Sequence, residues 1–192
     1  LAPLYGLLAD YYAEHGETRL RITRESLSGC WDALADQRAD LVLGASGDPP
    51  GGGYASQPLG EIRFVFAMAP GHPLAAEAEP LAAEVRARHR AVVMADSSRR
   101  LPTRTVGLVS GQETLTVPSM QAKIEAQIAG LGVGFLPEPL AGPYIASGRL
   151  VTRRVEEGNP DEALFLAWHT RRRGRTLAWF IERFRDWDVR LG

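Results

Sequence analysis

The sequence predicts an α/β fold, and three observations support this. Helical and strand patterns alternate along the chain, as βα units with mainly parallel sheets require. Apolar residues make up 45% of the 192 residues, which is enough to bury a core in one domain or two small lobes. Residues 120–137 place a helical apolar pattern before a group of glycines and a buried strand after it.

The first half of the sequence predicts two helices and three strands. Apolar spacing indicates a first helix over residues 4–11, which Gly16 ends, and then a half-exposed alternating strand over 19–23. Trp31 and Leu34 indicate a second helix. Strands follow over 40–43 and 62–69, and the glycine- and proline-rich residues 47–53 between them form a loop.

The second half predicts short strands at 91–95 and 114–117 and a helix that begins near Ser119. Its apolar residues recur at helical spacing, and Gly130 is expected to be the left-handed residue that ends it. Pro137 begins a further helix after a strand over 133–136. Two more strands follow at 150–155 and 163–168. A terminal amphipathic helix is indicated by Leu177, Phe180, Ile181, Phe184 and Trp187.

Composition excludes several classes of function. The net charge of −1 gives this segment no electrostatic attraction for nucleic acid. One cysteine, Cys30, cannot form an internal disulfide, which favours a reducing compartment. No apolar run approaches the roughly eighteen residues that a membrane span needs. The chain starts with Leu rather than Met, so we expect a fragment of a longer protein.

No catalytic or cofactor motif is found, and we expect neither an enzyme nor a bound cofactor. The glycines at 130–134 follow a helix and precede a strand, the reverse of a dinucleotide loop. The four histidines are isolated, so no metal site is predicted. Cys30 is interpreted as a core residue. The acidic residues at 156–162 and the basic run at 171–175 are interpreted as solvated surface.

Four segments occur in an order that resembles one known family. They are Asp40-Leu41-Val42-Leu43, Pro58-Leu59, Gly71-His72-Pro73-Leu74 and the unit of helix, glycines, strand and proline that ends at Pro137. This ordered set resembles the effector-binding domain of LysR-type transcriptional regulators over nearly all 192 residues. Two features of that family are missing from this sequence: the strand before the first helix, and the helix-turn-helix DNA-binding domain.

The resemblance implies two Rossmann-like lobes joined by two crossover strands, similar to type 2 periplasmic binding proteins. Residues 1–66 plus 167–192 would form the first lobe and 67–166 the second. It further implies a cytoplasmic regulatory domain that binds a small-molecule effector between the lobes and acts on DNA only through the absent N-terminal domain. A solute-binding receptor of a transport system is the alternative function.

The same resemblance implies a homodimer, or a tetramer in the longer protein. The sequence supports an association surface, because Tyr5, Tyr11 and Tyr12 on the first helix and the half-exposed strand at 19–23 would leave apolar area and a strand edge uncovered. We therefore expect the domain to pair through these elements.

Polar residues at predicted strand ends and helix starts are the candidate effector-binding residues, and two aromatic residues are candidates for an apolar wall. These residues are Ser28, Ser46, Asp96, Ser97, Ser98, Ser119, Phe135 and Trp168. Each has a structural alternative. Ser28 and Ser119 are also expected as helix N-caps, and Asp96 could cap a helix or pair with a nearby arginine. The two aromatic residues could belong to the core. This set suits a small organic anion or an aromatic compound.

Overall fold

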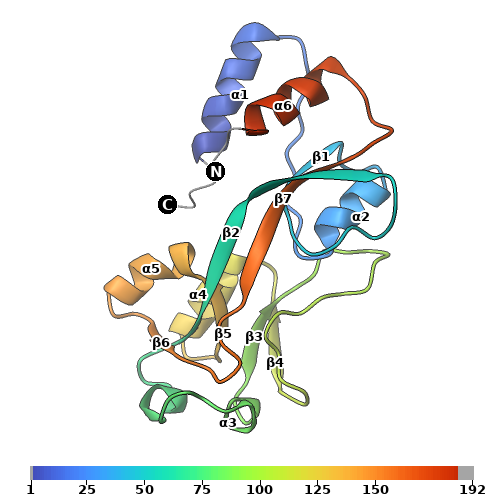
Figure 1. Cartoon of the computed structure of the whole chain (residues 1–192). Helices are drawn as coiled ribbons and strands as arrows, with labels where there is room; N and C mark the ends of the chain where they lie inside the picture. Colours follow the sequence, from blue (N-terminus) through green and yellow to red (C-terminus); the bar gives the residue numbers. More distant parts are fainter. Residues whose placement is uncertain (1, 186–192) are drawn as a thin grey trace.

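The computed structural model describes residues 2–185 and confirms a mixed α/β fold (Figure 1). The elements, in chain order, are α1 (Ala2–Glu14), α2 (Gly29–Ala35), β1 (Leu41–Ala45), β2 (Tyr54–Met68), a 3-10 turn (Pro73–Ala76), α3 (Ala83–Ala87), β3 (Ala91–Met94), β4 (Thr114–Val117), α4 (Met120–Ile128), β5 (Gly134–Pro137), α5 (Glu138–Ala146), β6 (Val151–Arg153), β7 (Asp161–His169) and α6 (Arg175–Arg185).

The sheets differ from the expected mainly parallel pairing. The larger sheet has the order β1-β7-β2-β5, with β6 also on β2, and all of these pairs are antiparallel. Only β3 and β4 form a parallel ladder among the described strands. The reason is that β2, with 15 residues, and β7, with 9, lie against each other through the middle of the fold. The long strand β2 then pairs with β5 and β6 at its far end.

Two groups of elements are joined by these long strands (Figure 1). We define the upper group as α1, α2, β1 and α6, and the lower group as α3, β3, β4, α4, β5, α5 and β6. Strands β2 and β7 run side by side from one group to the other. Within the upper group, α1 packs against α6, and the ring centroids of Tyr11 and Phe180 are 4.9 Å apart.

Three sequence expectations need correction. Residues 19–23 form no strand, because no strand within residues 2–185 pairs with them, although their alternating pattern is typical of one. Tyr11 is not part of an exposed surface: it is 1% exposed and packs on α6, whereas Tyr5 and Tyr12 are exposed. Pro58 and Leu59 lie within β2, at a register irregularity opposite β7, so β2 begins eight residues before the predicted strand at 62–69.

Most other elements agree with the sequence patterns. Ser119 caps α4, since its hydroxyl accepts a hydrogen bond from the Ala122 N–H at 3.1 Å, and Gly130 has the left-handed φ of 75°. The terminal helix is present as α6, and Trp187 lies outside the described residues. None of the helices within residues 2–185 has the length and apolar character that crossing a membrane requires.

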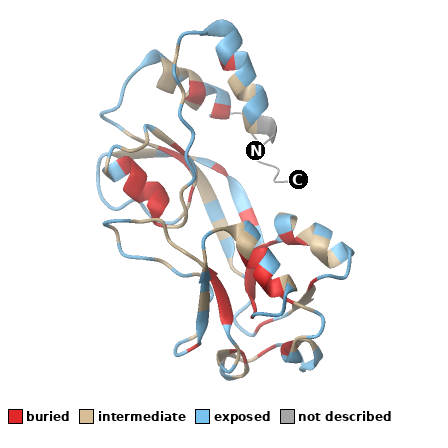
Figure 2. Cartoon of the chain, turned by 180° about the vertical axis from the view of Figure 1, so that it is seen from behind, coloured by how far each residue is buried: buried red, intermediate tan, exposed pale blue. Residues whose placement is uncertain are grey.

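Buried residues form several clusters rather than one (Figure 2). Helix α2 is buried along almost its whole length, from Gly29 to Leu34, although it has only seven residues. A helix so short has little stability of its own. It is therefore held by what packs around it, and part of that covering comes from the lower group.

Candidate functional site

A loop from the lower group binds α2 in the upper group. We call residues 95–104, which follow β3, the strap. The carboxylate of Asp32 accepts hydrogen bonds from three consecutive strap N–H groups, those of Arg99, Arg100 and Leu101, at 3.1–3.2 Å. Burial alone would raise the pKa of Asp32, but these bonds and one from Arg38 outweigh it and lower the pKa to about 2. Asp32 is thus a buried anion that fixes the strap to α2.

Asp96 makes the reciprocal contact at the start of α2. Its two carboxylate oxygens accept hydrogen bonds from the N–H groups of Ser28 and Gly29, at 3.2 and 3.1 Å. They also accept bonds from Ser98 and Arg104 within the strap. Burial would raise the pKa of Asp96, and the bonds outweigh that effect and lower it. A carboxylate from the lower group therefore satisfies the first N–H groups of α2.

Ser97 extends this interface to the residues just before α2. Its hydroxyl accepts from the Ser26 N–H at 2.8 Å and lies 2.6 Å from a carboxylate oxygen of Glu25, to which it donates. The fit around Gly29 is tight, because a Cβ there would lie 1.9 Å from the Ser97 Oγ. The two groups of elements are thus joined by a polar interface with little free space.

Arg104 ends the strap and extends this interface to β7. Its guanidinium donates to the Ser46 carbonyl at 3.3 Å and to a Glu162 carboxylate oxygen at 3.0 Å. The side chain of Glu162 is only 17% exposed. The expectation that the acidic residues at 156–162 are all solvated is therefore wrong for Glu162, which lies in β7 and is paired with an arginine.

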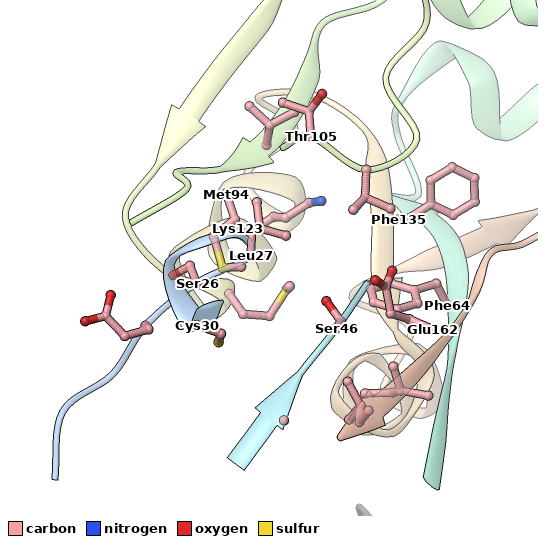
Figure 3. Close-up of a pocket in the computed structure, with 17 residues that line it drawn as sticks. Ser26, Leu27, Cys30, Ser46, Phe64, Met94, Thr105, Lys123, Phe135 and Glu162 are labelled. Carbon is pink, nitrogen blue, oxygen red and sulfur yellow. The ribbon is translucent and has the colours of Figure 1, made fainter. Parts of the chain in front are cut away.

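A cavity of about 220 Å³ lies beside the two ends of the strap, where the flanking residues Met94 and Thr105 line it (Figure 3). Both groups of elements line it, together with the long strands that join them. Leu27 and Ser46 belong to the upper part, Phe64 and Glu162 come from β2 and β7, and the lower group contributes residues of β3, α4 and β5. The volume is below the roughly 300–1,000 Å³ of pockets for drug-sized ligands. It therefore suits a small metabolite.

Lys123 is the cationic side chain that lines this cavity. It lies on α4 and is 6% exposed, and its ammonium group has no hydrogen bond or ion pair with any residue from 2 to 185. Desolvation by burial lowers the pKa of Lys123 to about 8. In Figure 3 its nitrogen projects from α4 toward the space between Leu27 and Phe135. A buried, unpartnered ammonium group therefore faces the cavity.

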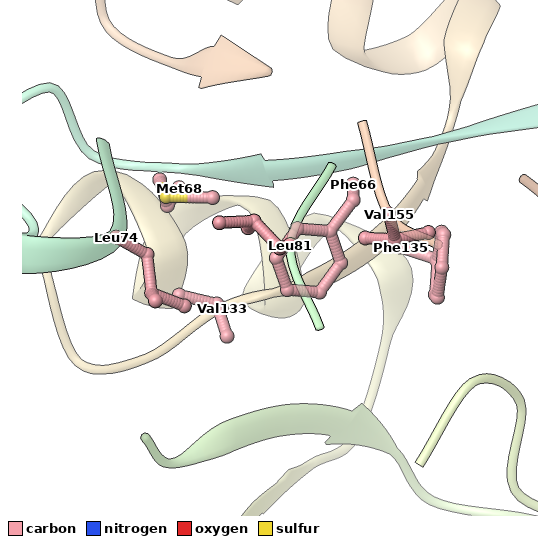
Figure 4. Packing of buried hydrophobic residues seen from close by; sticks show 7 residues of the cluster. All are labelled: Phe66, Met68, Leu74, Leu81, Val133, Phe135 and Val155. Atoms are coloured by element: carbon pink, nitrogen blue, oxygen red, sulfur yellow. The ribbon is translucent and has the colours of Figure 1, made fainter. Parts of the chain in front are cut away.

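The rest of the wall is mostly apolar. Phe135 is shared between the cavity and the lower core, where its ring lies 5.2 Å from that of Phe66 and packs with Val155 (Figure 4). Cys30 also lines the cavity and belongs to a buried cluster, which confirms its interpretation as a core residue. Burial, together with the nearby charges of Glu25 and Asp96, raises the pKa of its thiol to about 11, so the thiol stays neutral.

The structure places the eight sequence candidates in different surroundings. Ser46 and Phe135 line the cavity. Asp96, Ser97 and Ser98 form hydrogen bonds in the strap interface, and the Ser28 N–H is bonded there.

Ser28 does not cap α2 with its side chain, because its backbone is helical (φ −61°, ψ −21°) and the Asp96 carboxylate takes the position of the cap. Ser119 caps α4 and Trp168 packs beside the Tyr11 cluster; neither lines the cavity.

Sequence reasoning missed Lys123, which is the only lysine in the sequence; all other residues in the Lys and Arg total of 22 are arginines. Its position on α4, one residue before the buried Ile124 and one turn before the buried Gln127, was the available signal. It also missed the Arg104 pair with Glu162, because their spacing of 58 residues leaves no local pattern.

Comparisons with known proteins agree with this architecture. The profile of the LysR substrate binding domain matches residues 2–188. The chain is 37% identical over 181 residues to the HTH-type transcriptional regulator YeeY of Escherichia coli K12, covering 94% of this chain and 58% of that protein. The chain thus spans little more than half the length of that relative.

Two solved structures share the fold. The regulatory domain of the LysR family regulator MetR from Neisseria meningitidis matches with a TM-score of 0.69 at 20% identity, covering 98% of this chain and 87% of that one. The Synechocystis CcmR regulatory domain, solved in complex with 2-PG, matches with a TM-score of 0.71 at 13% identity, covering 97% and 91%. The family match over residues 2–188 and the 37% identity to YeeY show that the chain belongs to the LysR substrate-binding domain family.

Proposed function

We propose that this chain is the small-molecule-sensing domain of a LysR-type transcriptional regulator, with its effector site in the cavity beside the strap. The cavity carries the proposal, because both groups of elements line it and a ligand there would contact both. The MetR and CcmR domains support it as relatives in fold, and the CcmR domain was solved with a small molecule, 2-PG.

In this proposal the two groups of elements are Rossmann-like lobes joined by the crossover strands β2 and β7. Residues 1–66 plus 167–192 form the first lobe and 67–166 the second. The strap then belongs to the second lobe and binds the first through Asp32 and Asp96. A ligand that contacts both walls favours one spacing of the lobes, and a DNA-binding segment elsewhere in the protein responds to that population shift.

Among the eight candidates, we propose Ser46 and Phe135 as direct effector contacts. Four other candidates form the strap interface: Ser28, Asp96, Ser97 and Ser98. In this proposal they set the spacing of the lobes and do not contact the ligand.

A thermal-shift screen of small metabolites tests the site, because a ligand that binds only the folded chain raises its melting temperature. Thr105 lines the cavity and is exposed, so Thr105→Trp should block it with little effect on the core. Thr103→Trp is the matched control, since Thr103 is also exposed and lies outside the wall. Compounds that stabilise the wild type and Thr103→Trp but not Thr105→Trp support the cavity. Equal stabilisation of all three places the site elsewhere.

We also propose that the domain forms a homodimer in the cytoplasm, and that the longer protein binds DNA through a helix-turn-helix segment. Tyr5, Tyr12 and Ile22 support pairing, because these large apolar side chains are 58%, 42% and 55% exposed. The molar mass in solution tests this. A mass that stays monomeric at high concentration would exclude pairing through this surface.

A further inference from the structure

Lys123 occupies a position that is costly for a charged side chain. It is 6% exposed, and its side chain forms no hydrogen bond or ion pair within residues 2–185. Buried charges in proteins are normally paired, and lysine is among the residues least often fully buried without a partner. Of the 22 lysine and arginine residues, 21 are arginines, and the single lysine is the one that lines the cavity.

The other charged groups of the cavity wall already have partners. The Glu25 carboxylate is bonded to the Arg38 guanidinium and to Ser97. The Glu162 carboxylate is paired with Arg104 at 3.0 Å. The Arg38 guanidinium is shared, because it also bonds the Asp32 carboxylate. Neither acid of the cavity wall bonds the Lys123 ammonium group, which is left without a partner within residues 2–185. A ligand group that pairs with this ammonium group carries a negative charge.

The remaining wall defines the body of that ligand. Leu27, Phe64, Met94 and Phe135 present apolar surface to the same space, and the cavity of about 220 Å³ excludes bulky molecules. A compact anion with a short apolar body matches both properties. A carboxylate accepts hydrogen bonds from an ammonium group, and the apolar body attached to the carboxylate can then lie against the apolar wall.

We propose that Lys123 binds the carboxylate of a small monocarboxylate effector, and so makes the cavity selective for this anion over neutral molecules of the same shape. The proposal rests on the cavity being the effector site. It adds the chemical class of the effector and the residue that selects it.

The test uses pairs of acids and amides that differ in charge but little in shape: propionate with propionamide, hexanoate with hexanamide, and benzoate with benzamide. Affinity for the 192-residue chain is measured by calorimetry for the wild type, Lys123→Met and Arg63→Met. Methionine keeps the length and apolar body of lysine. Arg63 is the matched control, because it lies on β2 between the cavity residues Ile62 and Phe64 but is itself exposed and lines no part of the wall.

We expect at least one acid to bind the wild type more tightly than its amide. Lys123→Met should lower the affinity for that acid by about tenfold to a hundredfold, the usual range for loss of a hydrogen bond to a charged group. It should leave the amide unchanged, and Arg63→Met should bind both as the wild type does.

Two results would overturn the inference. If acids and amides bind equally and Lys123→Met changes neither, the cavity is a ligand site but Lys123 does not select anions, and the proposed function stands. If none of the acids binds, the selectivity for monocarboxylates is wrong. The proposed function fails separately, when the metabolite screen finds no compound whose effect Thr105→Trp removes.

Discussion

Replacing Lys123 by methionine should stabilise the folded chain while it removes the anion site. The pKa of Lys123 falls from the ordinary 10.5 to about 8 because the protonated amine is desolvated. At about 1.4 kcal/mol per pKa unit, the buried charge costs about 3 kcal/mol at neutral pH. Methionine fills the same space without the charge, so the free energy of unfolding should rise by up to about this amount.

The pH dependence gives the sharper form of this prediction. Between about pH 8 and 10.5 the unfolded chain keeps the lysine proton that the folded chain has released, so Lys123 contributes a rise in stability with pH in this range. The Cys30 thiol, whose pKa is raised to about 11, acts in the opposite direction above about pH 9, and it does so in both proteins. The methionine variant lacks this rise. The other titratable groups of the cavity wall, Glu25, Cys30 and Glu162, are present in both proteins. So are Glu61 and Arg63, the exposed charged residues of β2, which packs against α4.

Urea unfolding of both proteins across this pH range measures the effect. The difference should be largest at neutral pH and shrink as the pH approaches 10.5. Arg63→Met should stay within about 0.5 kcal/mol of the wild type, as expected for an exposed position. A methionine variant that is less stable than the wild type at neutral pH, or whose difference from it does not change with pH, would refute the reasoning.

Three further substitutions test the interface and the helix cap, each by urea unfolding. Asp32→Asn should lower the free energy of unfolding by about 2–4 kcal/mol, because the buried carboxylate accepts three strap N–H bonds. Since the pKa of Asp32 is lowered to about 2, the stabilisation by this carboxylate is present above about pH 4 and is lost as the pH falls. A variant as stable as the wild type would contradict this. Gly29→Ala should cost about 1–3 kcal/mol, because the added Cβ clashes with Ser97. Gly142→Ala in α5 is the matched control and should gain up to about 1 kcal/mol, because outside the local helix backbone no atom of the described residues lies within 4 Å of the added Cβ. Equal effects of the two substitutions would disprove the close contact at Gly29. Ser119→Ala should lose about 1 kcal/mol through its cap, and no loss would show that the cap contributes nothing.

The parts of the fold that local signals determine were predictable from the sequence. The unit from Ser119 to Pro137 is an example: a cap, a helix, a left-handed glycine and a buried strand follow each other as expected. Each signal acts within a few residues, so its consequence does not depend on the rest of the chain. The family resemblance rested on such segments, and the family match over residues 2–188 confirms it.

Features that depend on distant partners were not predictable. The alternation at 19–23 is typical of a strand, but a ladder needs a neighbouring strand, and the described part of the chain places none beside these residues. Asp96 was a candidate for a helix cap, yet the helix that it caps begins 67 residues earlier in the sequence. Lys123 was missed because a lysine on an amphipathic helix is usually solvated, and only the packed structure shows that this one faces a cavity.

The pKa of Lys123 tests the central claim most directly. Because the chain has one lysine, protein made with isotope-labelled lysine gives a single side-chain resonance whose pH titration reports this group alone. The structure predicts a pKa of about 8 without ligand and a rise when the acid that binds best in calorimetry is present at saturation, because a bound carboxylate stabilises the ammonium form. A pKa near 10.5 that the acid leaves unchanged would contradict both the burial of Lys123 and its role as the anion site.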